Sequence, residues 1–118
     1  CSWPDGGGHG NNPDVSVKGV LSTDYATRAA VDYALAHKDT LVIVTADHET
    51  GLIHAAANRV NPRRPHVLYQ TTGHSQSPVP VFAFGPGAEN FHGMMDNTDI
   101  PKVFARFWEL PLRQAVAE

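Results

Sequence analysis

The chain has 118 residues, of which 42% are hydrophobic and 18% charged, and its formal net charge is −3. These values predict one globular domain rather than a disordered chain, and the lack of any basic run argues against nucleic acid as a partner. No apolar stretch is long enough to span a membrane, and the single cysteine, Cys1, excludes an internal disulfide. Seven histidines in so short a chain direct attention to metal binding.

The first twelve residues predict a loop, because they contain Pro4 and four glycines. Asp5 and His9 are four residues apart, but the three glycines between them disfavour a helix. We therefore expect a loop that folds back and lets both side chains reach one point. The alternative is a plain flexible turn.

Asn12 and Pro13 predict the start of a helix, with Asn12 as its N-cap and Pro13 at its first position. This helix is expected from about residue 14 to residue 37, with a possible break near Gly19 and the polar residues 22–24. A buried strand follows it. Helix followed by strand is half of a βαβ unit, which predicts an α/β fold with a mostly parallel sheet flanked by helices.

Residues 41–46 are mainly Leu, Val and Ile, which predicts a strand buried on both faces. Asp47 and His48 follow at once, where open α/β sheets place their ligand sites. An adjacent carboxylate and imidazole suit a zinc-like divalent ion. The alternative is that Asp47 caps the next turn and His48 is an ordinary polar residue.

Residues 53–72 give weaker signals: a short strand or helix at residues 54–57 and an exposed loop at residues 61–65. Arg63 and Arg64 in this loop are expected to be solvated rather than to bind an anion. His54 and His66 have no partner at ligand spacing.

His74 lies in a Gly-Ser loop ahead of a second strand at residues 79–84, where Pro80 indicates a sheet edge. A final helix is expected over residues 99–109, capped by Asn97 or Thr98. Its apolar stripe is expected to pack in the core and consists of Ile100, Val103, Phe104, Phe107 and Trp108.

The residues best suited to hold metal are two carboxylates and three imidazoles: Asp5, His9, Asp47, His48 and His74. A catalytic zinc is typically held by three protein ligands. Five ligands therefore exceed one such site and fall one short of two. Paired metal ions about 4 Å apart are typical of phosphoryl transfer.

Three stretches that contain these residues resemble the C-terminal part of the catalytic domain of alkaline phosphatases. Their order and spacing match the family across nearly the whole chain. The stretches are Asp5-x-x-x-His9 followed by Asn11 and Asn12, the run Thr-Ala-Asp-His-Glu-Thr-Gly at 45–51, and Thr-Gly-His at 72–74 leading into residues 79–88. The resemblance implies that residues 1–118 are the C-terminal segment of an alkaline-phosphatase-like domain whose N-terminal part is missing.

The resemblance also implies roles for the five residues. Asp5, His9 and His74 would ligate one zinc ion, and Asp47 and His48 a second. The family hydrolyses phosphate monoesters through a phosphoserine intermediate. Its serine nucleophile, its phosphate-clamping arginine and its magnesium ligands have no counterpart here, so the chain by itself is expected to be inactive. Gly6 and Leu52 depart from residues often found in the family.

For the full-length protein, the resemblance implies Mg²⁺ beside two Zn²⁺, a homodimer, and a periplasmic or secreted location. Two other functions stay open. The parent could be a phosphodiesterase or sulfatase of the same superfamily, or the chain could be a non-catalytic metal-binding module. A fragment of such a domain would expose apolar surface and associate.

Overall fold

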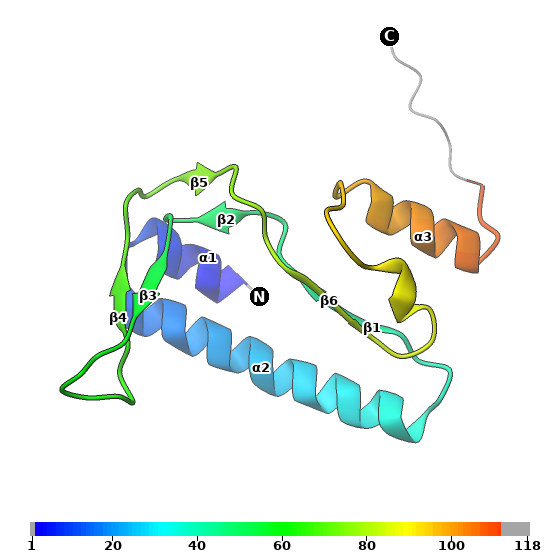
Figure 1. Ribbon diagram of the computed structural model, residues 1–118, viewed down its shortest axis with the longest axis horizontal. Coiled ribbons are helices and arrows are strands. Elements are labelled where there is room, and N and C mark those ends of the chain that lie inside the picture. Colours follow the sequence, from blue (N-terminus) through cyan, green and yellow to red (C-terminus); the bar gives the residue numbers. More distant parts are fainter. Residues whose placement is uncertain (1, 112–118) are drawn as a thin grey trace, which may run out of the picture.

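The computed structural model describes residues 2–111. Within them, helices alternate with short strands along the chain. The elements are α1 (Ser2–His9), α2 (Pro13–Ala36), β1 (Val42–Thr45), β2 (Glu49–Thr50), β3 (His54–Ala56), β4 (His66–Leu68), β5 (His74–Ser75), β6 (Val81–Phe84), the 3-10 helix η1 (Ala88–Asn90) and α3 (Asp99–Phe107). Figure 1 shows the long α2 running alongside the β1–β6 pair, with α1 between α2 and the short β2 and β5 strands.

The N-terminal segment is helical, so the predicted loop is wrong. Glycine costs about 1 kcal/mol relative to alanine in a helix, but α1 uses its glycines for close packing. Gly7 and Gly8 are buried, and a Cβ on Gly8 would lie 2.7 Å from the backbone oxygen of Thr50. Packing against α2 and β2 therefore outweighs the poor helix propensity of this segment.

Helix α2 confirms the predicted start. The Asn12 side chain accepts a hydrogen bond from the Val15 amide, and Pro13 opens the helix. The possible break in the middle does not occur. Gly19 instead gives α1 room to approach, since a Cβ there would lie 2.6 Å from the Pro4 nitrogen.

The predicted strands at residues 41–46 and 79–84 correspond to β1 and β6, and they pair with each other. The pair is antiparallel, with Val42 opposite Phe84 and Thr45 opposite Val81. Pro80 lies just outside the strand, and its carbonyl accepts a hydrogen bond from the Thr45 hydroxyl. Strand β1 is only half-buried, so the expected burial on both faces is not found in the described part of the chain.

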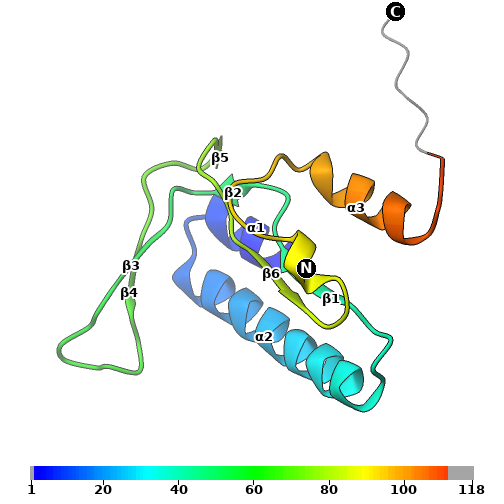
Figure 2. The ribbon, with the colours of Figure 1, turned by 45° about the vertical axis from the view of Figure 1, so that its right-hand side comes forward.

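The other two strand pairs, β2–β5 and β3–β4, are also antiparallel. A parallel sheet is therefore absent from residues 2–111. The helix–strand order predicted a parallel sheet. The strand that pairs with β1 is instead β6, which follows β2, β3, β4 and β5 in the chain. The loop at residues 57–65, which joins β3 to β4, lies to the left of the helices in both views (Figures 1 and 2), and Arg64 in it reaches Asp14 near the start of α2.

Helix α3 begins where it was predicted and ends two residues earlier, at Phe107. Thr98 precedes it, but its side chain makes no capping hydrogen bond. Val103 is buried, whereas Phe107 and Trp108 are exposed. The predicted stripe therefore packs only in part, against the segment around Phe91, whose ring lies 6.1 Å from the ring of Phe104.

Candidate metal centre

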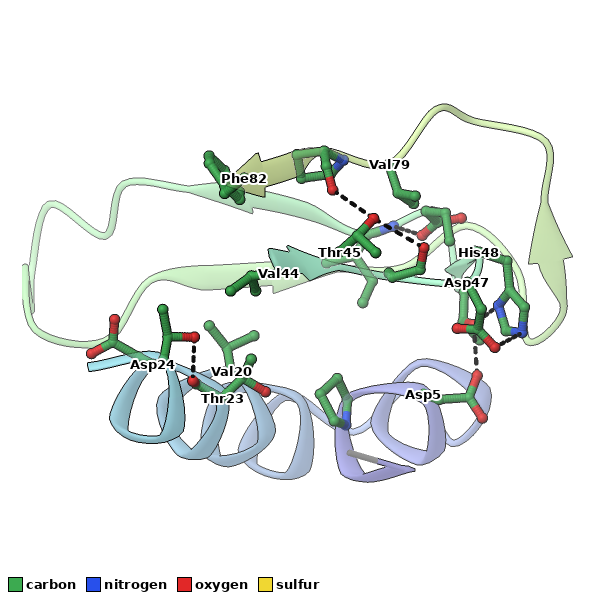
Figure 3. Close-up of a pocket in the computed structure, with 17 residues that line it drawn as sticks. Asp5, Val20, Thr23, Asp24, Val44, Thr45, Asp47, His48, Val79 and Phe82 are labelled. Atoms are coloured by element: carbon green, nitrogen blue, oxygen red, sulfur yellow. Dashed lines mark hydrogen bonds and ion pairs between the residues drawn. The ribbon is translucent and has the colours of Figure 1, made fainter. Parts of the chain in front are cut away.

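The five predicted metal-binding side chains lie together, although they come from three separate segments of the sequence. Asp5 and His9 stand on α1, and the helix places them on one face because they are four residues apart. Asp47 and His48 follow β1, and His74 begins β5. Figure 3 shows Asp5 pointing toward the corner that carries Asp47 and His48.

Three of these side chains form a compact triad. The Oδ1 atom of Asp5 lies 3.5 Å from Nε2 of His9 and 3.8 Å from Nε2 of His74. The two Nε2 atoms are 3.0 Å apart. Ligands at zinc's usual bond lengths of 2.0–2.1 Å in a tetrahedron lie about 3.3–3.4 Å from one another. The three distances in the triad lie on either side of that value, between 3.0 and 3.8 Å.

The orientation of His9 makes Nε2 the atom that is free to bind a metal. Its Nδ1 atom lies 2.5 Å from the carbonyl oxygen of Thr72. A carbonyl can only accept, so Nδ1 carries the proton in the neutral ring and Nε2 keeps its lone pair. Metal-binding histidines in proteins are typically held in this way.

His48 and Asp47 lie beside the triad. The His48 ring stacks on the His74 ring at 3.6 Å between centroids, and its ligand nitrogen lies within 4.8 Å of the ligand atoms of Asp5 and His74. Asp47 Oδ2 is 3.3 Å from His48 Nε2, and the Asp47 side chain is 87% exposed. Asp5 and His74 thus belong to two possible triads, of which the one with His9 has the shorter distances.

Thr50 is a member of the cluster for which the sequence predicted no role. Its hydroxyl donates to Asp5 Oδ1 at 2.7 Å and lies 3.2 Å from His48 Nδ1. The residue is 7% exposed. One signal in the sequence could have indicated it, since residues two apart in an extended segment face the same side, and Thr50 follows His48 by two.

The charge of Asp5 is stabilised by this arrangement. The hydrogen bond from Thr50 is the main cause that lowers the pKa of Asp5, burial acts in the opposite direction, and the imidazoles of His9, His48 and His74 add to the lowering. Asp5 is therefore an anion at neutral pH. A carboxylate beside imidazole nitrogens is a donor set that suits zinc.

Glu49, the residue after His48, makes hydrogen bonds that hold β2 next to β5. Its carboxylate accepts hydrogen bonds from the Ser75 hydroxyl at 2.5 Å and from the amides of Leu52 and Ile53 at 3.1 Å each. Burial opposes the charge, but these bonds together lower the pKa of Glu49. Glu49 directly follows His48 and Ser75 directly follows His74, so their hydrogen bond connects the two segments that carry these histidines.

A groove of about 790 Å³ opens beside the cluster. Asp5, Asp47 and His48 line one end of it, and mostly apolar side chains line the rest. Figure 3 shows Val20 on α2 across the groove from Val44 on β1.

Other histidines and arginines among residues 2–111 make contacts outside the cluster. His54 and His66 are exposed on β3 and β4, and His54 Nε2 is 2.6 Å from the side-chain nitrogen of Gln70. Arg64 makes an exposed ion pair of 3.6 Å with Asp14. Nothing in these contacts assigns the arginines to an anion site.

None of the helices in residues 2–111 has the length and apolar character that a membrane crossing requires.

Comparison with known proteins agrees with this arrangement. The family model for alkaline phosphatase matches residues 2–63 and 53–110, which is almost the whole chain. The chain belongs to the alkaline phosphatase family. The resemblance seen in the sequence motifs is therefore confirmed.

The alkaline phosphatases to which the chain is similar are longer. It is 34% identical over 113 residues to the streptomycin-6-phosphate phosphatase of Streptomyces griseus, covering 78% of this chain and 24% of that protein. It is 24% identical to alkaline phosphatase 3 of Bacillus subtilis, covering 83% and 36%, and 29% identical to the alkaline phosphatase of Escherichia coli, covering 78% and 23%. The chain thus spans about a quarter to a third of these relatives.

Solved structures show the same fold. The alkaline phosphatase of the Antarctic bacterium TAB5 superposes with a TM-score of 0.83 at 35% identity, covering 94% of this chain and 34% of that one. A mutant of that enzyme with Mg bound in its M3 site superposes with a TM-score of 0.84 at 34% identity, covering 94% and 35%. Residues 2–111 therefore have an alkaline-phosphatase-like fold.

Proposed function

We propose that the protein carrying this chain is a zinc-dependent phosphomonoesterase, and that this chain supplies five ligands of its two-zinc centre. Asp5, His9 and His74 hold one ion, and Asp47 and His48 contribute to the second. The observation that carries the proposal is the convergence of Asp5 Oδ1 and two imidazole Nε2 atoms within 3.0–3.8 Å of one another.

Two acceptor atoms of the triad, Nε2 of His9 and the carboxylate of Asp5, support a cation at its centre. The lone pair of His9 Nε2 faces His74 Nε2 at 3.0 Å, and the carboxylate of Asp5 can only accept hydrogen bonds. Lone pairs that face one another at this distance repel unless a proton or a metal ion lies between them. A divalent ion satisfies all three atoms at once.

The second ion would be held by Asp47 and His48 with further ligands from outside this chain. The Asp47 side chain is 87% exposed at the edge of the groove, so its oxygens are accessible. Two ligands fall short of the three that a catalytic zinc usually has. The family resemblance supports an aspartate from an earlier part of the protein as the missing ligand.

Zinc, when bound, stabilises negative charge on a phosphoryl group and lowers the pKa of coordinated water toward 7. The residues of this chain would hold the ions and orient their ligand atoms. The serine that forms a phosphoserine, and the magnesium ligands, would come from the part of the protein outside this chain. The chain by itself would then be inactive, because it lacks the nucleophile.

Further features of the longer protein rest on family membership. We propose that residues 1–118 form the C-terminal segment of one alkaline-phosphatase-like domain with a mostly parallel sheet flanked by helices, within which β1 and β6 are two strands. A homodimer and a periplasmic or secreted location are proposed on the same ground. The name of the streptomycin-6-phosphate phosphatase, beside the phosphatase names of the other relatives, supports phosphate monoesters as the substrate class.

The test uses the protein encoded by the full reading frame that contains this chain. Turnover of a chromogenic aryl phosphate monoester is compared with turnover of the matching diester and sulfate ester. We expect the monoester to be preferred by at least about 100-fold, activity to disappear after chelation, and zinc to restore it. The 118-residue chain alone should show no turnover above background.

Three results would contradict the proposal. Preference for the diester or the sulfate ester would assign the protein to another branch of the superfamily. Zinc binding without turnover of any of the three esters would favour a non-catalytic metal-binding module. Full activity after exhaustive chelation would remove the role of the five ligands.

A further inference from the structure

One hydroxyl group connects the two halves of the metal centre. Thr50 is almost fully buried, and its Oγ1 atom contacts Asp5 on α1 and His48 after β1 at the same time. We infer that Thr50 is a positioning residue shared by both zinc sites, an inference that rests on the proposed function. It contacts a ligand assigned to each ion rather than the ions themselves.

The direction of the two hydrogen bonds follows from their partners. The Asp5 carboxylate can only accept, so the single hydroxyl proton of Thr50 points to Asp5 Oδ1 at 2.7 Å. The Thr50 oxygen is then left to accept from His48 Nδ1, 3.2 Å away. His48 therefore carries its proton on Nδ1 and presents the lone pair of Nε2.

The hydroxyl thus sets two ligand atoms together. It neutralises part of the charge on Asp5 and fixes which oxygen faces Thr50, and it selects the ring nitrogen with which His48 can bind a metal. Outer-shell partners of this kind typically change metal affinity by about 10–100-fold when they are removed. Here one such partner serves ligands that belong to different ions.

Packing around Thr50 keeps the hydroxyl in place. Gly8 of α1 lies so close that a Cβ there would be 2.7 Å from the Thr50 carbonyl oxygen and 2.9 Å from its methyl carbon. Across the β2–β5 pair, Thr50 lies opposite His74. The residue is therefore held between the helix that carries Asp5 and the strand that carries His74.

The test measures zinc affinity at both sites by competition with chelators of graded strength, in the protein from the full reading frame. Thr50→Val replaces the hydroxyl by a methyl group of similar size, and both ions should bind about 10–100-fold more weakly. Thr50→Ser keeps the hydroxyl and should restore both affinities to within about threefold. The matched control is Thr27→Val, since the Thr27 hydroxyl bonds only the Thr23 carbonyl of its own helix among the described residues; its zinc affinities should not change.

Thr50→Ala is a second variant without the hydroxyl, in case valine prevents folding. Loss of affinity for one ion alone, or unchanged affinity for both in the folded Val or Ala variant, would overturn the shared role of Thr50. Zinc affinities in Thr50→Ser that fall as far as those in Thr50→Val would also overturn the role of the hydroxyl. These results differ from failure of the proposed metal centre, in which the wild-type protein itself would bind no zinc, and from failure of the proposed reaction, in which the wild-type protein would bind zinc but turn over no ester.

Discussion

The side chains of the centre are held by groups that are not themselves proposed ligands. The Thr72 carbonyl orients His9, the Thr50 hydroxyl orients His48, and both contacts leave Nε2 free. Second partners of this kind determine which nitrogen of an imidazole can bind a metal. In the proposed centre, recognition of an ion would thus depend on backbone and hydroxyl groups that a search for ligand residues alone would not include.

Asp5 is the residue on which the centre should depend most, because it contacts both imidazoles of the triad and Thr50. Asp5→Asn keeps the shape and removes the charge. We expect zinc affinity at that site to fall by more than about 100-fold, beyond the range for outer-shell partners. Chelator competition measures the change. Asp24→Asn, an exposed carboxylate on the helical wall of the same groove, is the control, and equal losses in both variants would refute the role of Asp5.

At the scale of the elements, the centre depends on how closely α1 approaches β2. Gly8 gives this approach its room, since its neighbour across the contact is the Thr50 backbone. Gly6 lies on the same helix, but a Cβ there would meet nothing within 4 Å. Alanine substitutions at these two glycines therefore distinguish the effect of close packing on stability from the effect of helix propensity.

We expect Gly8→Ala to reduce the free energy of unfolding by about 1–3 kcal/mol, because the methyl group forces α1 away from β2. Zinc affinity should fall with it. Gly6→Ala should instead stabilise the protein by about 0.5–1 kcal/mol, since alanine is the better helix former. Urea unfolding of both variants measures the difference. A Gly8→Ala protein as stable as Gly6→Ala would show that the two elements are not in close contact.

The start of α3 is stabilised by two carboxylates. Hydrogen bonds from the backbone and then the hydroxyl of Thr98 lower the pKa of Asp96, and a bond from Lys102 is the main cause that lowers the pKa of Asp99. A pKa lowered by folding means that the contribution to stability is complete above the ordinary value of 3.8 and is lost as the pH falls through the lower folded value. The start of α3 should therefore fray only in acid.

NMR titration of the carboxyl carbons tests this expectation. Both groups should titrate below pH 3.8. Thr98→Val removes the hydroxyl, so the pKa of Asp96 should rise part of the way, while that of Asp99 should stay low because Lys102 still pairs with it. An Asp96 that titrates at or above its ordinary value in the wild-type protein would be the contrary result.

At the scale of the whole molecule, the chain is open. Its radius of gyration is 17.2 Å, against about 13 Å for a compact domain of this length. Large apolar side chains such as Val20, Tyr25, Phe82 and Trp108 are more than half exposed. The surface therefore has the apolar exposure that was expected for a part of a larger domain.

Association is the consequence that can be measured. At concentrations of about 100 µM, the 118-residue chain should form dimers or larger species by light scattering, because association buries apolar side chains that are exposed in the single chain. Phe82→Ser, on the side chain that is 64% exposed at the groove, should reduce association. A monodisperse monomer for the unaltered chain would count against the expected role of this surface.

The sequence by itself determined the features that depend on near neighbours. Asn12 and Pro13 predicted the start of α2, and the runs of Val, Ile and Phe predicted β1 and β6. The five candidate ligands could also be selected, because their residue types and their motifs are visible in the chain. Their role as metal ligands stays a prediction.

Only the tertiary structure decided what depends on contacts between distant residues. The glycines of α1 disfavour a helix locally, but Gly8 packs on Thr50, 42 positions later. The antiparallel pairing of β1 with β6 and the link from Asp5 through Thr50 to His48 arise in the same way. Local propensities amount to about 1 kcal/mol per residue, so close packing between segments far apart in the sequence can override them, and no short window of sequence contains that information.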